Sequence, residues 1–238
     1  MSVDELLFAV LPYVALVLAV VVTVLRWRRH AFTVSALSSQ ILESRKLFWG
    51  SVSFHWGISI VLVGHLLALL IPSAFTLWNG APLRLYLLEI TGFGLGLWAA
   101  FGVGVLIYRR LSNRRVAAVT TPMDLVVLAV IAVQIITGLW IAFGYRWGSF
   151  WGPGVFTPYV RSLFVLDPRV DLVAPLPFIL KTHVVAFWAF LLVFPFTRLV
   201  HIITVPLGYL FRPWQKVIRT SREPGVYHPA SDRPLERV

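Results

Sequence analysis

Five long apolar stretches constrain the fold of this 238-residue chain more than any other feature. A helix needs about 20 predominantly apolar residues to cross the ~30 Å hydrocarbon core of a bilayer. Charged residues are rare in all five stretches, and 58% of the chain is hydrophobic against 13% charged. Such a composition is unlike that of a soluble enzyme and excludes disorder. The predicted spans are residues 6–25, 47–71, 85–108, 125–145 and 177–200.

Basic residues are distributed unevenly between these spans. Most of the 21 lysines and arginines follow the first, third and fifth spans, and the other two loops hold few. Because cytoplasmic loops carry such an excess, we predict an all-α integral membrane protein with the N-terminus outside and the C-terminus cytoplasmic. The five transmembrane helices occupy residues 1–211, and residues 212–238 form a proline-containing cytoplasmic tail. A short interfacial helix is expected near 160–166.

The net charge of +11 would suggest nucleic acid as a partner for a soluble protein. In a membrane protein, an excess of lysine and arginine in the cytoplasmic loops explains this charge, so we expect contact with membrane lipid and no nucleic-acid partner. The chain has no cysteine. Disulfides, thiolate zinc sites, cysteine-ligated iron–sulfur clusters and covalently attached c-type haem are therefore excluded.

Four of the six histidines lie within predicted spans, and two spans hold all four. Ionisable residues in a membrane are costly and usually face a functional interior. His55 and His65 lie ten residues apart in the second span, and His183 and His201 lie eighteen apart in the fifth. On unbroken helices these spacings correspond to about 15 Å and about 27 Å along the axis, with the second pair on one stripe. A bend at Pro195 is expected to absorb part of this difference.

The two spans run in opposite directions, so the topology pairs His65 with His183 near the outer surface and His55 with His201 near the inner one. A b-type haem takes one imidazole on each face of its ring, and two haems provide a path for electrons across the bilayer. A metal site would need three or four converging ligands, yet Glu89 is the only acid near a span interior. Two bis-histidine b haems are thus the favoured cofactors, and Lys181 and Arg198 are candidate partners for their propionates.

Several segments resemble the gamma subunit of respiratory nitrate reductase, a dihaem cytochrome b anchor. The histidine spacings are the specific part of this resemblance, which covers roughly residues 10–220. The matching segments are Ser38-Ser39-Gln40, Phe54-His55-Trp56-Gly57, Val63-Gly64-His65, Ala118-Val119-Thr120-Thr121 and the stretch from Phe194 to His201.

The resemblance implies the same two haem-ligand pairs and a multi-pass protein of a prokaryotic cytoplasmic (inner) membrane. It further implies that quinol is oxidised near the outer haem. Electrons would then pass to an iron–sulfur beta subunit and a molybdenum-containing alpha subunit, which reduces nitrate in the cytoplasm.

The resemblance also suggests where quinol binds. Family members commonly have a lysine before the third span, but this chain has none, so Arg84 and Tyr86 are the nearest polar candidates. Lys181 lies within one turn of His183, and Gly64 beside His65 would let a ring approach the haem edge. Alternatively, Arg84 is an interfacial anchor and Tyr86 belongs to the aromatic belt.

Two other functions compete with this one. A related dihaem anchor could serve another cytoplasmic reductase, which only its partner subunits would reveal. A haem-free transporter or assembly anchor would use the histidines for a metal or for protons. The sequence supports it little, because membrane carboxylates and broken-helix repeats are missing.

Overall fold

Five helices long and apolar enough to span a membrane make up most of the fold, as the sequence predicts. The computed structural model describes residues 1–29 and 42–202, so the predicted tail, residues 212–238, lies outside the described residues. The spans are Val3–Arg29, Arg45–Leu70, Pro82–Ser112, Pro122–Gly144 and Phe178–Phe196. The first combines α1 (Val3–Glu5), the π-helical turn η1 (Leu6–Val10) and α2 (Leu11–Arg29), and the next three are α3 (Arg45–Leu70), α5 (Pro82–Ser112) and α7 (Pro122–Gly144).

Capping residues set where the spans begin, a few positions earlier than hydropathy alone suggests. Thr121 and Asp124 form a reciprocal capping box at the start of α7, and Pro122 occupies its first turn. Ser2 and Glu5 form the same motif at the start of α1. Each motif satisfies backbone N–H groups that have no partner within the helix.

The α-helix of the fifth span, α9, is shorter than predicted. Helix α9 (Phe178–Val193) gives way to a 3-10 turn, η4 (Phe194–Phe196), and the chain is extended at Thr197 before a second turn, η5 (Leu199–Ile202). Pro195 lies at this break, where its ring and missing N–H disfavour a continuing α-helix. Arg26 donates to the carbonyl groups of Pro195 and Thr197 and so ties the break to α2. His183 and His201 therefore do not share one stripe of an unbroken helix.

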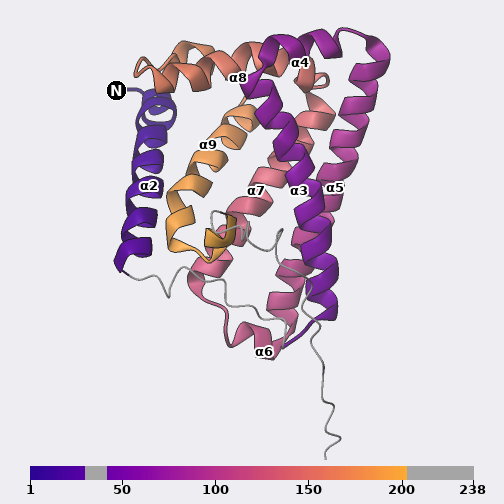
Figure 1. Ribbon diagram of the computed structural model, residues 1–238, viewed down its shortest axis with the longest axis vertical. Coiled ribbons are helices and arrows are strands. Elements are labelled where there is room, and N and C mark those ends of the chain that lie inside the picture. The colour runs from indigo at the N-terminus through magenta and orange to yellow at the C-terminus, as the bar shows by residue number, and fades with distance from the viewer. Residues whose placement is uncertain (30–41, 203–238) are drawn as a thin grey trace, which may run out of the picture. The chain divides into compact units, whose positions relative to one another are not determined.

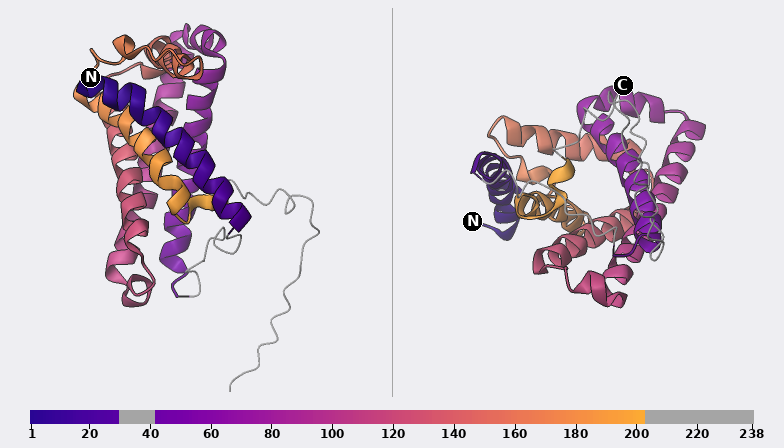
Figure 2. Two further views of the ribbon diagram at one scale, coloured as in Figure 1. Left: turned by 90° about the vertical axis from the view of Figure 1, so that its left-hand side faces the viewer. Right: turned by 60° about the horizontal axis from the view of Figure 1, so that its bottom comes forward.

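The long helices pack in the spatial order α3, α5, α7, α9, α2 (Figures 1 and 2). Helices α3 and α5 approach most closely, because glycines lie at their contact. A Cβ atom on Gly57 would lie 2.6 Å from the Leu95 carbonyl oxygen, and one on Gly102 would lie 2.7 Å from that of Gly50. Packing of α3 directly against α9 is not extensive among the described residues.

Two further helices, α4 (Pro72–Asn79) and α8 (Gly148–Phe164), lie at the end where the N-terminus lies (Figure 1). The sequence predicts only a short helix near 160–166, whereas α8 has 17 residues. Tyr159 and Leu163 of α8 join Phe8 in a hydrophobic core, and the Tyr159 hydroxyl donates to the Phe8 carbonyl oxygen over 2.9 Å. Helix α8 therefore links the first span to α3 and α4. At the opposite end, the short helix α6 (Arg114–Ala117) joins α5 to α7.

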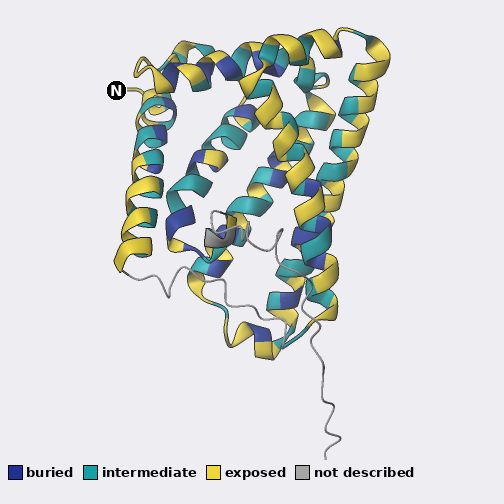
Figure 3. Ribbon diagram, viewed as in Figure 1, coloured by how far each residue is buried: buried dark blue, intermediate teal, exposed yellow. Residues whose placement is uncertain are grey.

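Exposed apolar residues occur along all of the long helices (Figure 3). Only 11% of the residues in the most hydrophobic stretch of α3 are buried. Ile136 and Trp140 of α7 are 60% and 62% exposed. Continuous apolar surface of this kind is unfavourable in water. The fold is thus that of a multi-pass membrane protein, in which lipid covers these faces.

Candidate functional site

The spanning histidines lie on α3, α9 and η5. His55 and His65 belong to α3, His183 to α9 and His201 to η5. The side chain of His201 lies outside the described residues. The other three imidazoles can be compared directly.

His55 and His65 make the same bond within α3. Nδ1 of His55 lies 2.7 Å from the carbonyl oxygen of Ser51, and Nδ1 of His65 lies 2.8 Å from that of Val61. A carbonyl oxygen only accepts hydrogen bonds, so each Nδ1 carries the proton. Each Nε2 is then the nitrogen with the lone pair, which is the form that binds a metal.

His183 also holds its proton on Nδ1, but the partner of that nitrogen belongs to α7 and not to its own helix. Its Nδ1 lies 2.9 Å from Oγ1 of Thr137, whose hydroxyl donates to the Val133 carbonyl oxygen over 2.7 Å. The hydroxyl has only one proton, so it accepts from Nδ1–H of His183. The Gln134 side-chain Nε2, a donor, lies 3.1 Å from Nε2 of His183. Both contacts place the proton of His183 on Nδ1.

In this tautomer, each of the three histidines would be able to hold a haem iron through Nε2. A ligating imidazole normally donates its other N–H to a carbonyl or similar acceptor, which fixes the ring and raises its basicity. Residues 1–29 and 42–202 contain no group of three or more histidine, aspartate, glutamate or cysteine side chains arranged around one point. The donor set thus favours imidazole pairs over a carboxylate-rich metal site.

The histidines of α3 and α9 differ in how open their surroundings are. Both α3 histidines are exposed, and α3 and α9 do not pack extensively against each other. A Cβ atom on Gly64 would meet nothing within 4 Å, whereas one on Gly138 would lie 3.0 Å from Cε1 of His183. Gly64 borders open space, and Gly138 lets α7 approach the ring.

Arg84, Tyr86 and Lys181, three of the four candidate quinol-binding residues, each contact a different partner in this structure. The Arg84 guanidinium stacks 4.9 Å from the ring centre of Trp78, and the Tyr86 ring packs edge-on against Trp147 at 4.8 Å. Nζ of Lys181 forms an ion pair with Asp4 of α1, with nitrogen–oxygen distances of 2.9 and 3.0 Å. Gly64 belongs to α3.

Tyr86 lines a cavity of about 330 Å³ at the junction of α4, α5 and α8. Beside it, a polar network missed by the sequence reasoning centres on Ser149. The Glu89 carboxylate accepts from the backbone N–H and the hydroxyl of Ser149 over 2.8 and 2.5 Å, and the Asn79 amide donates to the Ser149 carbonyl oxygen over 2.9 Å. Glu89 thus accepts from the first turn of α8, where the helix dipole favours negative charge.

The opposite end of the helices carries two ion-pair groups. Arg109, only 2% exposed, donates to the Glu43 carboxylate over 2.7 Å. Partial burial would raise the pKa of Glu43, but hydrogen bonds from the Lys46 backbone and from Arg109 outweigh it and lower that pKa. Asp124 lies 3.5 Å from both Arg110 and Arg198. Lys181 and Arg198, the candidate propionate partners, therefore both pair with carboxylates of the chain.

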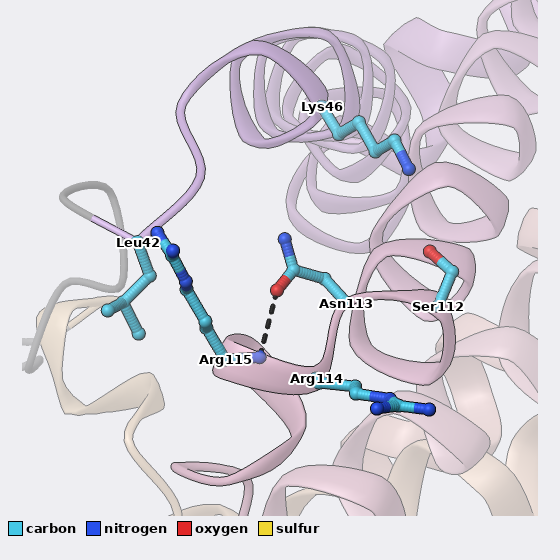
Figure 4. A pocket seen from close by; sticks show the side chains of 6 residues that line it. All are labelled: Leu42, Lys46, Ser112, Asn113, Arg114 and Arg115. Atoms are coloured by element: carbon cyan, nitrogen blue, oxygen red, sulfur yellow. Dashed lines mark hydrogen bonds between the residues drawn. The ribbon is translucent and has the colours of Figure 1, made fainter.

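A basic pocket of about 360 Å³ lies at this same end (Figure 4). Asn113 lies between Lys46 and Arg115 in this view, and its side chain accepts from the Arg115 backbone N–H over 3.0 Å. The residues lining the pocket are Leu42, Lys46, Ser112, Asn113, Arg114 and Arg115.

Gln134 and Thr137 are the functional candidates that sequence reasoning missed. They lie three residues apart, and hence on one face of α7, in a span without charge beyond its cap. Polar side chains repeated on one face of a membrane helix are a signal that could have identified them.

Comparison with known proteins shows the family. The family model described as nitrate reductase gamma subunit matches residues 4–220. The nitrate reductase gamma chain of Bacillus subtilis is 30% identical over 88% of this chain and 96% of its own length. The respiratory nitrate reductase 1 gamma chain of Escherichia coli is 31% identical over 88% of this chain and 95% of its own length.

A third relative is longer. The nitrate reductase-like protein NarX of Mycobacterium tuberculosis is 36% identical over 92% of this chain, which spans only 34% of that relative. The match of the family model over nearly all of the described spans and the two full-length relatives together confirm the resemblance inferred from the histidine motifs: the chain belongs to the nitrate reductase gamma subunit family.

Proposed function

We propose that this chain is a membrane cytochrome b subunit that oxidises quinol near the outer surface and delivers the electrons to a cytoplasmic nitrate reductase. The observation that carries the proposal is the common state of the three described histidines. His55, His65 and His183 each hold the proton on Nδ1, so the lone pair lies on Nε2, which in His183 accepts from the Gln134 amide. Membership of the gamma subunit family supports the same conclusion.

The proposed ligand pairs are His65 with His183 and His55 with His201. When bound, two b haems supply one-electron transfer between the two membrane surfaces. The chain fixes each described imidazole by its Nδ1–H bond, so that the ring does not have to be ordered when the ligand bond forms. Charge sorting supports an outer position for the first pair and an inner one for the second.

The quinol site is proposed beside His65, on the side that Gly64 leaves open. Tyr86 borders a cavity at the same end of the protein, and Arg84 stacks on Trp78 nearby in the chain. Lys181 is the least favoured of the four candidates, because Asp4 already holds its ammonium group.

The proposed partners are an iron–sulfur beta subunit and a molybdenum-containing alpha subunit. The basic pocket formed by Lys46, Arg114 and Arg115 is a candidate contact for the beta subunit or for lipid headgroups. The relative NarX, named only as nitrate reductase-like, favours keeping a second candidate: a dihaem anchor that serves another cytoplasmic reductase.

Haem content tests the proposal first. The chain is purified from membranes in mild detergent, and its haem is measured as the alkaline pyridine haemochrome per mole of protein. Two b haems per chain are expected. No haem in gently prepared membranes would overturn the proposal and leave the haem-free transporter or anchor. Co-purified subunits then distinguish nitrate reductase from another reductase.

A further inference from the structure

Thr137 of α7 makes an unusual contact with His183. Thr137 is a buried residue, only 5% exposed. Its hydroxyl already donates its only proton to the Val133 carbonyl oxygen of its own helix. Its contact with Nδ1 of His183 at 2.9 Å is therefore the acceptor side of a hydrogen bond between two helices. His55 and His65, by contrast, donate to carbonyl oxygens within α3.

Gln134, one turn earlier, contacts the other nitrogen of the same ring. Its amide nitrogen lies 3.1 Å from Nε2 of His183, and its buried carbonyl oxygen has no hydrogen-bond partner. An unpartnered buried carbonyl is unfavourable, so this orientation of the amide has a cost that only its bond to Nε2 offsets. Gln134 therefore takes the position that a ligand of Nε2 would need, while Thr137 leaves that position open.

We infer that Thr137 is the positioning residue of His183: it selects the Nδ1–H tautomer, sets the ring angle from α7, and thereby tunes the outer haem. This inference rests on the proposed function. The physical reason is that an acceptor on Nδ1–H makes the imidazole a stronger donor through Nε2, which stabilises the ferric iron. Loss of the acceptor makes the ligand weaker and leaves a buried N–H without a partner.

The geometry explains why this ligand needs a residue from another helix. His183 lies in the second turn of α9, and Thr182 beside it directs its hydroxyl to the Phe178 carbonyl oxygen over 2.8 Å. Because the hydroxyl that holds the His183 ring belongs to Thr137 of α7, the orientation of the ring depends on how α7 packs against α9. The ligand of the outer pair on α9 is thus oriented by helix packing, and its partner on α3 by its own helix.

The test compares Thr137→Val, Thr137→Ser and Thr182→Val in the full complex purified from membranes. Redox titration of the haem absorbance gives two midpoint potentials, and low-temperature electron paramagnetic resonance reports the ligand geometry of each ferric haem. We expect Thr137→Val to raise one potential and to shift one resonance. Thr137→Ser is expected to restore both, and Thr182→Val, which removes a neighbouring hydroxyl, is expected to leave both unchanged.

The outcomes separate the two proposals. Wild-type complex without haem would refute the proposed function. Two haems in the wild type with both potentials unmoved in Thr137→Val would refute the positioning role alone. If Thr137→Val fails to assemble, Thr137→Ser and Thr137→Ala are compared instead. The inference requires that Thr137→Ser, which keeps the hydroxyl, has the potentials and resonances of the wild type, and that Thr137→Ala, which lacks it, does not.

Discussion

Nδ1 of His65 lies 2.8 Å from the carbonyl oxygen of Val61, one turn earlier in α3. Earlier in the same helix, Nδ1 of His55 lies 2.7 Å from the carbonyl oxygen of Ser51 in the same way. Each carbonyl fixes one tautomer of its histidine. Two spanning histidines that hold the proton on the same nitrogen both present Nε2 as a lone-pair atom, which is what the proposed ligand role requires.

Replacing these histidines is expected to remove haems one at a time. His65→Ala or His183→Ala should delete the outer haem and abolish quinol oxidation, and His55→Ala or His201→Ala should delete the inner haem. Pyridine haemochrome content and redox titration of purified complexes measure this. His228→Ala, in the polar tail, is the matched control and should keep both haems. Two haems in His183→Ala would contradict the pairing.

Glycine substitutions should separate packing from open space. Gly102→Ala places a methyl group 2.7 Å from the Gly50 carbonyl oxygen and should destabilise the protein by about 1–3 kcal/mol, because α3 must move away from α5. Gly94→Ala on the same helix meets nothing within 4 Å and should be neutral. Thermal unfolding in detergent compares the two, and equal midpoints would contradict the close α3–α5 contact.

The Arg109–Glu43 pair should show measurable coupling. Arg109 is buried, but the Glu43 carboxylate is 17% exposed and keeps hydrogen bonds from the backbone of Lys46 and Leu47. Arg109→Leu should therefore cost less than the ~3–5 kcal/mol typical of a fully buried pair, and adding Glu43→Gln should recover part of the loss. A double-mutant cycle by chemical denaturation measures the coupling. Simple additivity would show that the two side chains act independently.

The Glu43 pair also predicts a pH dependence. Because the pKa of Glu43 is lowered from 4.5 in the folded protein, its contribution to stability is present above that value and is lost as the pH falls through the folded pKa. Wild type should therefore unfold at a higher temperature than Glu43→Gln at pH 7. The difference should shrink below pH 4.5. A difference that grows on acidification would have the wrong sign.

The Tyr159 hydroxyl should anchor the first span to α8. Tyr159→Phe leaves the buried Phe8 carbonyl oxygen without this donor and should cost about 1 kcal/mol. Limited proteolysis near the N-terminus and the unfolding midpoint report the effect. Tyr145→Phe, at the end of α7, serves as the control and should behave as wild type.

The sequence determined the number of spans, their helical type and the histidine motifs. About 20 uncharged apolar residues leave a chain in lipid no alternative to a helix, because every backbone polar group must be paired internally. The second and fifth stretches also carried the histidine motifs, and the spacings of His55 to His65 and of His183 to His201 led to the correct family. Loop charges led to an orientation, which stays a prediction.

Only the tertiary structure decided what surrounds each histidine. Bonds to Ser51 and Val61 follow from the helix itself, but the bond from His183 to Thr137 depends on how α7 packs against α9. The break after Val193 and the length of α8 likewise depend on contacts distant in sequence, such as those of Arg26 and Tyr159. Hydropathy and spacing describe one helix at a time, whereas a bond between helices is set by the packing of both.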